Sequence, residues 1–301
     1  MTLIRKFFAS IISPFFRNKV ERRRVRGFLE FGPLRAARVA LQNRKMRSTQ
    51  PTYYLAICAI AKNEGPYFKE WIEWHAAQGV ERFYIYNNES TDNTHEILQP
   101  YINSGLVEYH FIEGKRKQTA AYNDCLKRHR YNSRWIAFID LDEFIVPIKY
   151  KTIPEFLNDF EGFPAVEINW LCYGSGGAKT HESGKIMERF RTHSHPNHEL
   201  NRHIKTIVYP RFALNFISSH YPTLLSGRAV DTNRNIVRKY FFQRAPLHDK
   251  VRINHYAVKS YEEFLVKKAR GRIMSLKQRG MDYFINFDRN EIEDKQNYNL
   301  S

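Results

Sequence analysis

The sequence predicts an α/β fold in which helices cover a mostly parallel sheet. Between residues 54 and 139, short apolar runs alternate with stretches of helical periodicity, and the links between them are short. Strand–helix alternation of this kind is typical of parallel sheets. A chain of 301 residues, of which 43% are hydrophobic and 15% aromatic, can also bury a sizeable core. We therefore expect one large domain, or one domain with a small annex.

The elements follow in order from local signals. Apolar runs predict strands at residues 54–61, 82–86, 107–112, 135–139 and 165–170. Helical spacing predicts helices at residues 66–79, 92–104, 119–130 and, with a basic character, 261–280. Pro66 is suited to the first turn of its helix, Asp92 to a helix N-cap, and Gly105 to a helix end.

The first 50 residues differ from the rest in charge. They contain thirteen Lys and Arg against two acids, which gives them +11 of the total net charge of +17. Apolar pairs recur every fourth residue between Leu3 and Phe16, a run that is too short and too charged to span a bilayer. We expect residues 1–50 to be a basic amphipathic segment that binds an anionic membrane surface. An amphipathic helix packed on the main domain is the alternative, and no nucleic-acid-binding motif accompanies the charge.

The three cysteines are odd in number and widely spaced, and Cys58 and Cys172 lie in apolar runs. Reduced core thiols are the expected state, which favours a reducing compartment. Together with the basic segment, this predicts a cytoplasmic protein, peripheral at the inner face of the cell membrane.

Acidic and amide side chains follow three of the predicted strands, at Asn63-Glu64, Asn87-Asn88-Glu89 and Asp140-Leu141-Asp142. Ligands of open parallel sheets bind beyond the carboxyl ends of the strands, so these clusters should converge on one crevice. Two carboxylates one residue apart repel each other, and a divalent cation relieves that repulsion. Asp140 and Asp142 thus predict a magnesium or manganese site, the alternative being a helix cap or turn.

Six segments, in this order, resemble glycosyltransferase family 92 and the related family 2-like group. They are residues 55–64 (LAICAIAKNE), 70–75 (EWIEWH), 84–92 (YIYNNESTD), 135–144 (WIAFIDLDEF), 169–170 with 173–177 (NW, YGSGG), and 254–256 with 259–264 (NHY, KSYEEF). The resemblance implies a GT-A fold, with a Rossmann-like nucleotide-sugar half at residues 51–150 and an acceptor half at 151–290. Residues 291–301 would form a tail.

The resemblance also implies a function: transfer of a sugar, galactose as first choice, from a UDP-sugar to a glycan or lipid-linked acceptor. The pathway would be surface polysaccharide or lipopolysaccharide biosynthesis, with inversion and a bound Mn²⁺ or Mg²⁺. Two alternatives remain: a nucleotidyltransferase, which usually has a Gly-rich loop absent from residues 61–64, and a non-catalytic membrane-binding module that retains the fold.

The implied site residues fall into three groups. The nucleotide-sugar would contact Ala59, Asn63, Glu64, Asn88, Asp92, Asp140 and Lys259. The metal would be held by Asp140, Asp142 and His255. The catalytic base is not fixed, and the candidates are Glu167, Glu188 and Asp231. Lys205 and Arg211 resemble a further family segment and are expected to meet either acidic acceptor groups or solvent.

Overall fold

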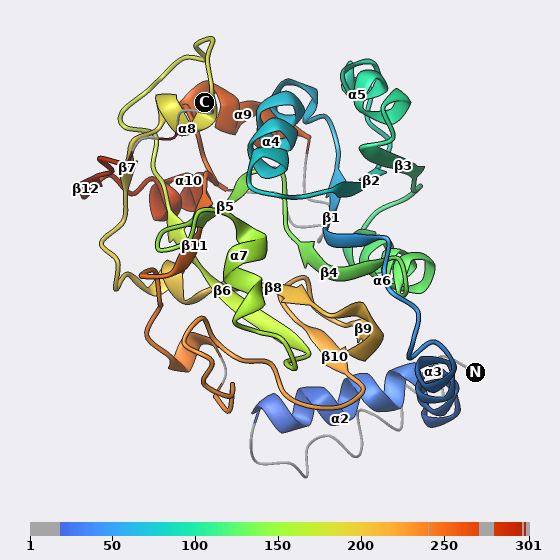
Figure 1. The fold of residues 1–301 in the computed structure, drawn as a ribbon. Coiled ribbons are helices and arrows are strands. Elements are labelled where there is room, and N and C mark those ends of the chain that lie inside the picture. The colour runs from blue at the N-terminus through green and yellow to red at the C-terminus, as the bar shows by residue number, and fades with distance from the viewer. Residues whose placement is uncertain (1–18, 240, 271–279, 297, 299–301) are drawn as a thin grey trace.

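A computed structural model describes residues 19–239, 241–270, 280–296 and 298. The apolar run between residues 3 and 16 and residues 271–279 of the predicted basic helix lie outside these ranges. Within them, eight strands form one central sheet in the order β3-β2-β1-β4-β8-β6-β11-β5 (Figure 1). The five predicted strands are present, with ends shifted by at most two residues: β1 (Tyr53–Ala61), β2 (Arg82–Asn87), β3 (Val107–Phe111), β4 (Ser133–Phe138) and β6 (Ala165–Cys172).

The sheet is mostly parallel, as the sequence predicts, but its second half is mixed. Strands β1 to β4 are parallel to one another, whereas β8 (Ile204–Val208) is antiparallel to both β4 and β6. Next, β11 (Val251–His255) is parallel to β6, and β5 (Glu143–Pro147) is antiparallel to β11 at the edge. Short two-stranded pairs are made by β9 (Ala213–Phe216) with β10 (Pro222–Leu224) and by β7 (Thr192–His193) with β12 (Ile292–Glu293).

Helices cover both faces of the sheet because the strands are apolar on both sides. Alternate residues of β1 point to opposite faces, so Leu55 and Ile57 join one core cluster and Ala56 and Cys58 the other. The first cluster includes residues of α4 (Gly65–Ala77) and α5 (Thr94–Asn103), the second those of α6 (Gln118–His129). From residue 150 onward, the described residues also form the helices α7 (Ile153–Asn158), α8 (Ile186–Arg189), α9 (Tyr261–Ala269) and α10 (Met281–Phe287), and the 3-10 turns Glu199–Arg202, Pro210–Phe212 and Phe241–Gln243.

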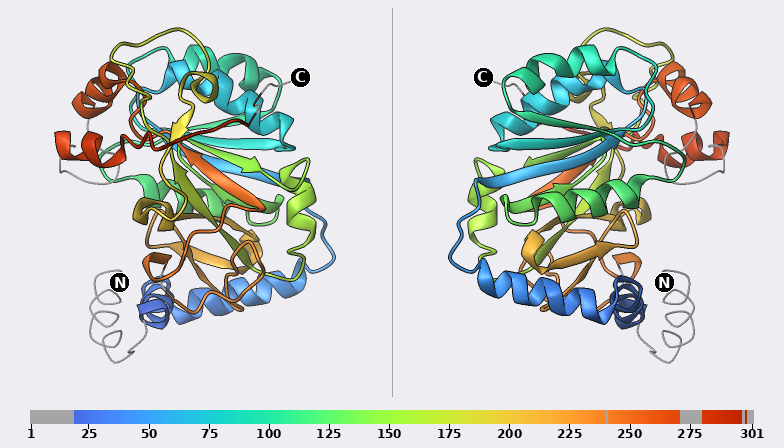
Figure 2. Two further views of the ribbon diagram at one scale, coloured as in Figure 1. Left: turned by 90° about the vertical axis from the view of Figure 1, so that its left-hand side faces the viewer. Right: turned by 90° about the vertical axis from the view of Figure 1, so that its right-hand side faces the viewer.

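The link from β4 to β5 forces the sheet to curl. Five residue steps separate Phe138 from Glu143 and can span at most about 18 Å. In a flat sheet, the four strand spacings between β4 and β5 would cover about 19 Å. The two halves of the sheet must therefore bend toward each other, and Figure 2 shows the resulting twist. Residues 139–142, which include both predicted metal-binding aspartates, lie at this bend.

Residues 19–49 pack on the main domain. Helices α2 (Lys19–Phe31) and α3 (Pro33–Lys45) lie along one end of the molecule, next to β9 and β10 (Figure 2). Ala36 and Val39 form a small buried cluster with Leu214 of β9. Arg211, instead of facing acceptor or solvent, donates hydrogen bonds to the backbone of this segment, at Met46 O (2.9 Å) and Thr49 O (2.5 Å).

No helix within the described residues is both long and apolar enough to cross a membrane. All three cysteines are free and buried, as predicted.

The packing of α2 depends on a glycine. A Cβ atom on Gly27 would overlap the side chain of Thr223 in β10. Gly27→Leu should therefore reduce the free energy of unfolding by about 1–3 kcal/mol, as over-packing does elsewhere. Urea denaturation followed by tryptophan fluorescence measures this loss, with Ala37→Leu, at an exposed position of α3, as the control. Equal stability of the two variants would contradict the tight packing of α2 on β10.

Candidate active site

Asp140 lies in a network at the bend between β4 and β5. Its Oδ1 accepts hydrogen bonds from Gln118 Nε2 (2.6 Å) and the Tyr122 hydroxyl (3.3 Å), both on α6. Its Oδ2 pairs with Lys205 Nζ of β8 at 2.9 Å. Lys205 is almost completely buried, at 1% exposed, so it is neither an acceptor contact nor a solvated charge. The lysine instead ties Asp140 to the middle of the sheet.

Glu143 completes this network beneath Asp140. The side chain is fully buried, and its Oε2 accepts a hydrogen bond from the Asp140 backbone N–H at 2.9 Å. Lys205 Nζ lies 3.5 Å from the same oxygen. Burial raises the pKa of Glu143 to about 8, with Lys205 opposing the rise. Because no water reaches it, Glu143 acts as a support for the turn, not as a group that contacts substrate.

Asp142 points to other partners than Asp140 does. Its Oδ2 accepts a hydrogen bond from Lys267 of α9 and lies 3.7 Å from His255 Nε2 at the end of β11. Burial opposes ionisation, but Lys267 and His255 hold the pKa of Asp142 well below its usual range. Burial also lowers the pKa of His255, so a neutral imidazole faces a carboxylate anion. An ionised carboxylate and an imidazole with a free lone pair suit a divalent cation.

The predicted three-residue metal site is therefore assembled only in part. Among the described residues, the ligand atoms of Asp140, Asp142 and His255 do not gather within 4.8 Å of one another. Asp142 and His255 do meet, whereas Asp140 is occupied by Lys205, Gln118 and Tyr122. Magnesium is commonly bound through one or two carboxylates together with substrate phosphates. The pair of Asp142 and His255 fits such a cation; Asp140 fits a supporting role.

A cleft opens beside Asp142, between the β1–α4 loop and α9. It is lined by Asn63, Pro66, Tyr67, Thr91, Asp92, Asn93, Lys259, Glu263, Val266, Lys267 and Arg270. Lys259 is 3% exposed, and its Nζ lies 4.2 Å from the centre of the Tyr67 ring. Among the described residues, no group accepts a hydrogen bond from this ammonium. Burial lowers the pKa of Lys259, with Asp142 and Glu64 opposing.

Arg270, at the end of α9, closes the cleft toward β1. It pairs with Glu64 at 2.8 Å and donates hydrogen bonds to the carbonyl oxygens of Lys62 (2.9 Å) and Asn63 (2.8 Å). Asn63 adopts a φ of 52°, a conformation that asparagine tolerates better than most residues. Its Oδ1 accepts a hydrogen bond from the Thr91 N–H at 2.7 Å. The loops that follow β1 and β2 are thus joined at the rim of the cleft.

Three other residues that were predicted to contact the nucleotide are hydrogen-bonded or buried within the protein. Asp92 links the first residues of α4 and α5, because it accepts hydrogen bonds from the backbone N–H groups of Gly65 (2.9 Å) and Thr94 (3.2 Å). Asn88 donates to the carbonyl oxygens of Ile112 and Gly114, both at 2.9 Å. Ala59 is fully buried inside β1. Of these three, only Asp92 lines the cleft.

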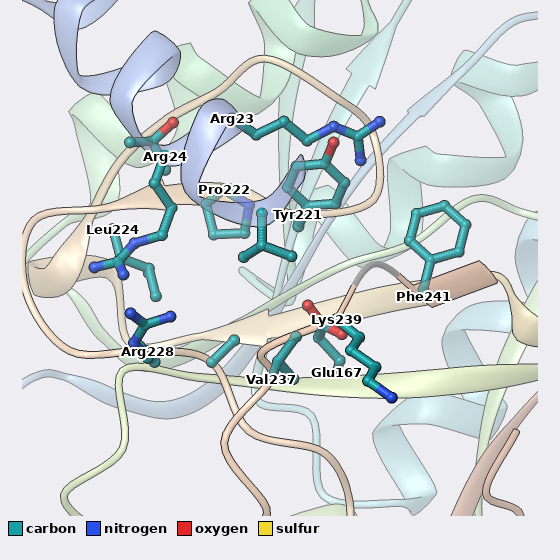
Figure 3. Close-up of a pocket in the computed structure, with 13 residues that line it drawn as sticks. Arg23, Arg24, Glu167, Tyr221, Pro222, Leu224, Arg228, Val237, Lys239 and Phe241 are labelled. Atoms are coloured by element: carbon teal, nitrogen blue, oxygen red, sulfur yellow. The ribbon is translucent and has the colours of Figure 1, made fainter. Parts of the chain in front are cut away.

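None of the three candidate bases lines this cleft. Glu167 pairs with Arg244 and belongs to a separate pocket beside α2, with Arg23, Arg24 and Tyr221 (Figure 3). Glu188 is exposed and pairs with Lys185 at 3.1 Å. Asp231 organises its own turn by accepting hydrogen bonds from the N–H groups of residues 233 and 235. The geometry therefore supports none of these side chains as the base.

The residues that sequence reasoning missed are Tyr67, Lys267 and Arg270. Lys267 and Arg270 are three residues apart, so they lie on the same side of α9 and its C-terminal end. The sequence indicates only that this helix is basic. Nothing local indicates which of its many basic residues face the cleft.

Comparisons with known proteins identify the family. The model of glycosyltransferase family 92 matches residues 53–296. A family 92 protein of Oryza sativa subsp. japonica is 29% identical over 124 residues, which cover 40% of this chain and 21% of that protein. Galactan β-1,4-galactosyltransferase GALS2 of Arabidopsis thaliana is 32% identical over 130 residues, which cover 38% of this chain and 25% of that protein. The chain thus matches about a quarter or less of these relatives' length.

Among solved structures, S. aureus TarS 1–349 in complex with UDP-GlcNAc is similar to this chain with a TM-score of 0.44 and 16% identity. The match covers 80% of this chain and 68% of that chain. The family model covers most of the chain, including the bend at Asp140 and the cleft with Lys259. The chain therefore belongs to glycosyltransferase family 92.

Proposed function

We propose that this glycosyltransferase moves galactose from UDP-galactose to a glycan or lipid-linked acceptor, in surface polysaccharide or lipopolysaccharide biosynthesis. The choice of galactose is supported by the galactan β-1,4-galactosyltransferases among its relatives. Inversion at the anomeric carbon is carried over from the family resemblance. The observation that carries the proposal is the buried Lys259 ammonium, which faces a cleft next to Asp142 and has no anion paired to it among the described residues.

The cleft suits a nucleoside diphosphate. Three cations line it: Lys267 of α9, and Lys259 and Arg270 just before and just after that helix. Cleavage of the sugar–phosphate bond places negative charge on the diphosphate, and cations already fixed in a low-dielectric cleft stabilise that charge. Asn63 and Asp92 lie at the opposite rim, where they would contact the nucleoside. The cleft therefore suits the nucleoside diphosphate, which is the leaving group of the proposed reaction.

We also propose that Asp142 and His255 hold Mn²⁺ or Mg²⁺, with diphosphate oxygens as further ligands. The support is their 3.7 Å contact, the ionised state of Asp142 and the neutral state of His255. A bound dication would supply Lewis-acid stabilisation of the departing diphosphate. Lys267, now paired with Asp142, would then be free to turn toward the same phosphates.

The acceptor would approach from the side of β6 and β11. The Trp170 ring lies 4.0 Å from the His255 ring and stacks on His203 at 4.7 Å. Trp170 Nε1 has no hydrogen-bond partner among the described residues. Trp170 is only 7% exposed, so the unsatisfied indole N–H, and not the ring face, is what an acceptor hydroxyl group would meet.

Replacing Lys259 tests the donor site. Lys259→Met should weaken UDP binding about 10- to 100-fold, because a charge-assisted hydrogen bond to phosphate is lost. Isothermal titration calorimetry with UDP measures the change, and Lys179→Met, at an exposed lysine, is the control. Unchanged UDP affinity in Lys259→Met would remove the diphosphate from this cleft. An assay of galactose transfer to a glycan acceptor, in which the UDP released is measured, then tests the full reaction.

The metal proposal has its own test. In the unaltered protein, Mn²⁺ should increase UDP affinity and EDTA should abolish the increase. In Asp142→Asn and His255→Ala, UDP should still bind through Lys259, but Mn²⁺ should no longer change its affinity, since the protein ligands are lost. Circular dichroism confirms that both variants fold. If EDTA leaves the UDP affinity of the unaltered protein unchanged, Lys267 and not a dication balances Asp142.

We further propose that the N-terminal segment binds an anionic membrane, at the cytoplasmic face. Helix α3 buries Ala36 and Val39 against the domain, while Leu34 and Leu41, on another face, are 82% and 62% exposed. Arg35 and the other basic residues of α3 surround them. Exposed leucines within a basic helix are suited to the interface of anionic lipids. Because α2 and α3 pack on the domain, point variants test this better than deletion does.

The double substitution Leu34→Glu/Leu41→Glu should lower vesicle binding at least about tenfold, by removing apolar contact and adding repulsion. Sedimentation of the full chain with phosphatidylcholine vesicles, with and without phosphatidylglycerol, measures it. Ile285→Glu, at a residue of α10 that is 64% exposed, is the matched control. Equal sedimentation of the double variant and the control would contradict membrane binding through α3.

A further inference from the structure

A second group of metal-ligand side chains lies apart from the cleft. Glu108 and His110 are two residues apart on β3, so they point to the same face of this edge strand. His129, the last residue of α6, approaches them from that face. Glu108 Oε1 lies 3.1 Å from His110 Nε2 and 3.3 Å from His129 Nε2. All three ligand atoms lie within 4.8 Å of one another.

Hydrogen bonding does not account for this cluster. His129 is only 5% exposed, yet neither of its ring nitrogens has a hydrogen-bond partner among the described residues. His110 Nε2 is also buried and unpartnered. Both Nε2 atoms lie close to Glu108 Oε1, but neither forms a hydrogen bond of normal geometry with it. Buried polar groups in native proteins nearly always have partners, so unpartnered ones indicate a missing ligand.

The geometry places both histidines as ligands, because the Nε2 atoms of His110 and His129 lie beside the same oxygen of Glu108. A neutral imidazole has a lone pair on one ring nitrogen, and this lone pair is what a transition metal binds. The two nitrogens nearest Glu108 can therefore both act as ligands.

The distances match those of a zinc site. With Zn–N and Zn–O bonds of about 2.0–2.2 Å, two ligand atoms of a tetrahedron are about 3.3–3.5 Å apart. Of the two separations from Glu108 Oε1, that to His129 Nε2 is 3.3 Å and falls in this range, and that to His110 Nε2 is 3.1 Å and lies slightly below it. Imidazole nitrogen also favours zinc over magnesium or calcium. We propose that Glu108, His110 and His129 bind a zinc ion, with water as the fourth ligand.

The surroundings hold these ligands in place. Arg82 pairs with Glu108 Oε2 at 3.1 Å, which leaves Oε1 for the metal. The Tyr84 ring stacks on His129 at 3.8 Å, and the Tyr86 ring on His110 at 4.7 Å. Partners of this kind fix the orientation of ligands in metal sites.

The ion would be structural. Gln118, which contacts Asp140, is at the other end of α6, and eleven residues of helix span about 16 Å. The zinc would fasten the end of α6 to the edge strand β3. It would thereby steady the helix that orients Asp140, without touching substrate.

The experiment uses the full chain, stripped of metal with EDTA and then titrated with ZnCl₂. We expect one zinc per chain by mass spectrometry, and a rise in Tm of about 5 °C at a zinc concentration a hundredfold above Kd. Substitution by Co²⁺ should give the visible absorption of a tetrahedral site. His110→Gln and Glu108→Gln should lose all three signals; they are preferred to changes at the more buried His129.

Two controls separate this site from others. His95→Gln, at an exposed histidine of α5, should keep the zinc signals. Asp142→Asn should also keep them, because the proposed donor-site metal is a different one. The proposal is overturned if zinc leaves the Tm of the unaltered protein unchanged, if His110→Gln keeps its zinc, or if Asp142→Asn loses it. Unchanged UDP affinity in His110→Gln would confirm that the ion is not part of the donor site.

Discussion

The active-site end of the fold depends on one buried ion cluster, in which Lys205 of β8 pairs with Asp140 and Glu143. The chain must leave β4, turn within four residues and enter β5 on the far side of the sheet. Glu143, at the end of that turn, is fully buried and would be costly to bury as a carboxylate without a cation. Lys205 supplies the cation from a strand that lies between the two halves. The same contact fixes Asp140 on one side of the turn, so that Asp142 faces the cleft on the other.

Strand β5 also depends on side chains of α4, which explains part of the family resemblance. As an edge strand it presents unpaired backbone groups on one side. Trp71 Nε1 donates to Glu143 O (2.8 Å) and Trp74 Nε1 to Ile145 O (3.0 Å). His75, whose pKa burial lowers to about 3, accepts from Ile145 N at 3.1 Å. The segment 70–75 is therefore recognisable from sequence because it supports the active-site turn, not because it carries chemistry.

The sequence alone predicts the parallel half of the fold well and the mixed half poorly, for a physical reason. Local apolar runs indicate the strands from 54–61 to 135–139, and the first three of them are each followed by a helix that its own periodicity predicts. The positions of β5, β8 and β11 depend on contacts between residues far apart in the chain, which local patterns do not contain. The same limit explains why Lys205 was expected at the surface, and why Glu167 was a candidate base although it pairs with Arg244 in a separate pocket. The set of Glu108, His110 and His129 cannot be recognised from the sequence for the same reason. His110 and His129 are nineteen positions apart in the chain, and only the fold brings them together.

The charges of the cleft explain how it can be stable without substrate and still receive an anion. Most of its charged groups are balanced within the protein: Arg270 by Glu64, Lys267 by Asp142, and Glu263 by Arg189. Lys259 differs, because its nearest contact is the face of the Tyr67 ring, which stabilises a cation more weakly than a carboxylate does. Its φ of 59° and the capping box of Ser260 and Glu263 hold it at the start of α9, so the ammonium does not have to be moved when an anion arrives. A diphosphate would gain the full interaction with a charge that the fold has already buried and positioned, and this is the condition under which electrostatic stabilisation is strongest.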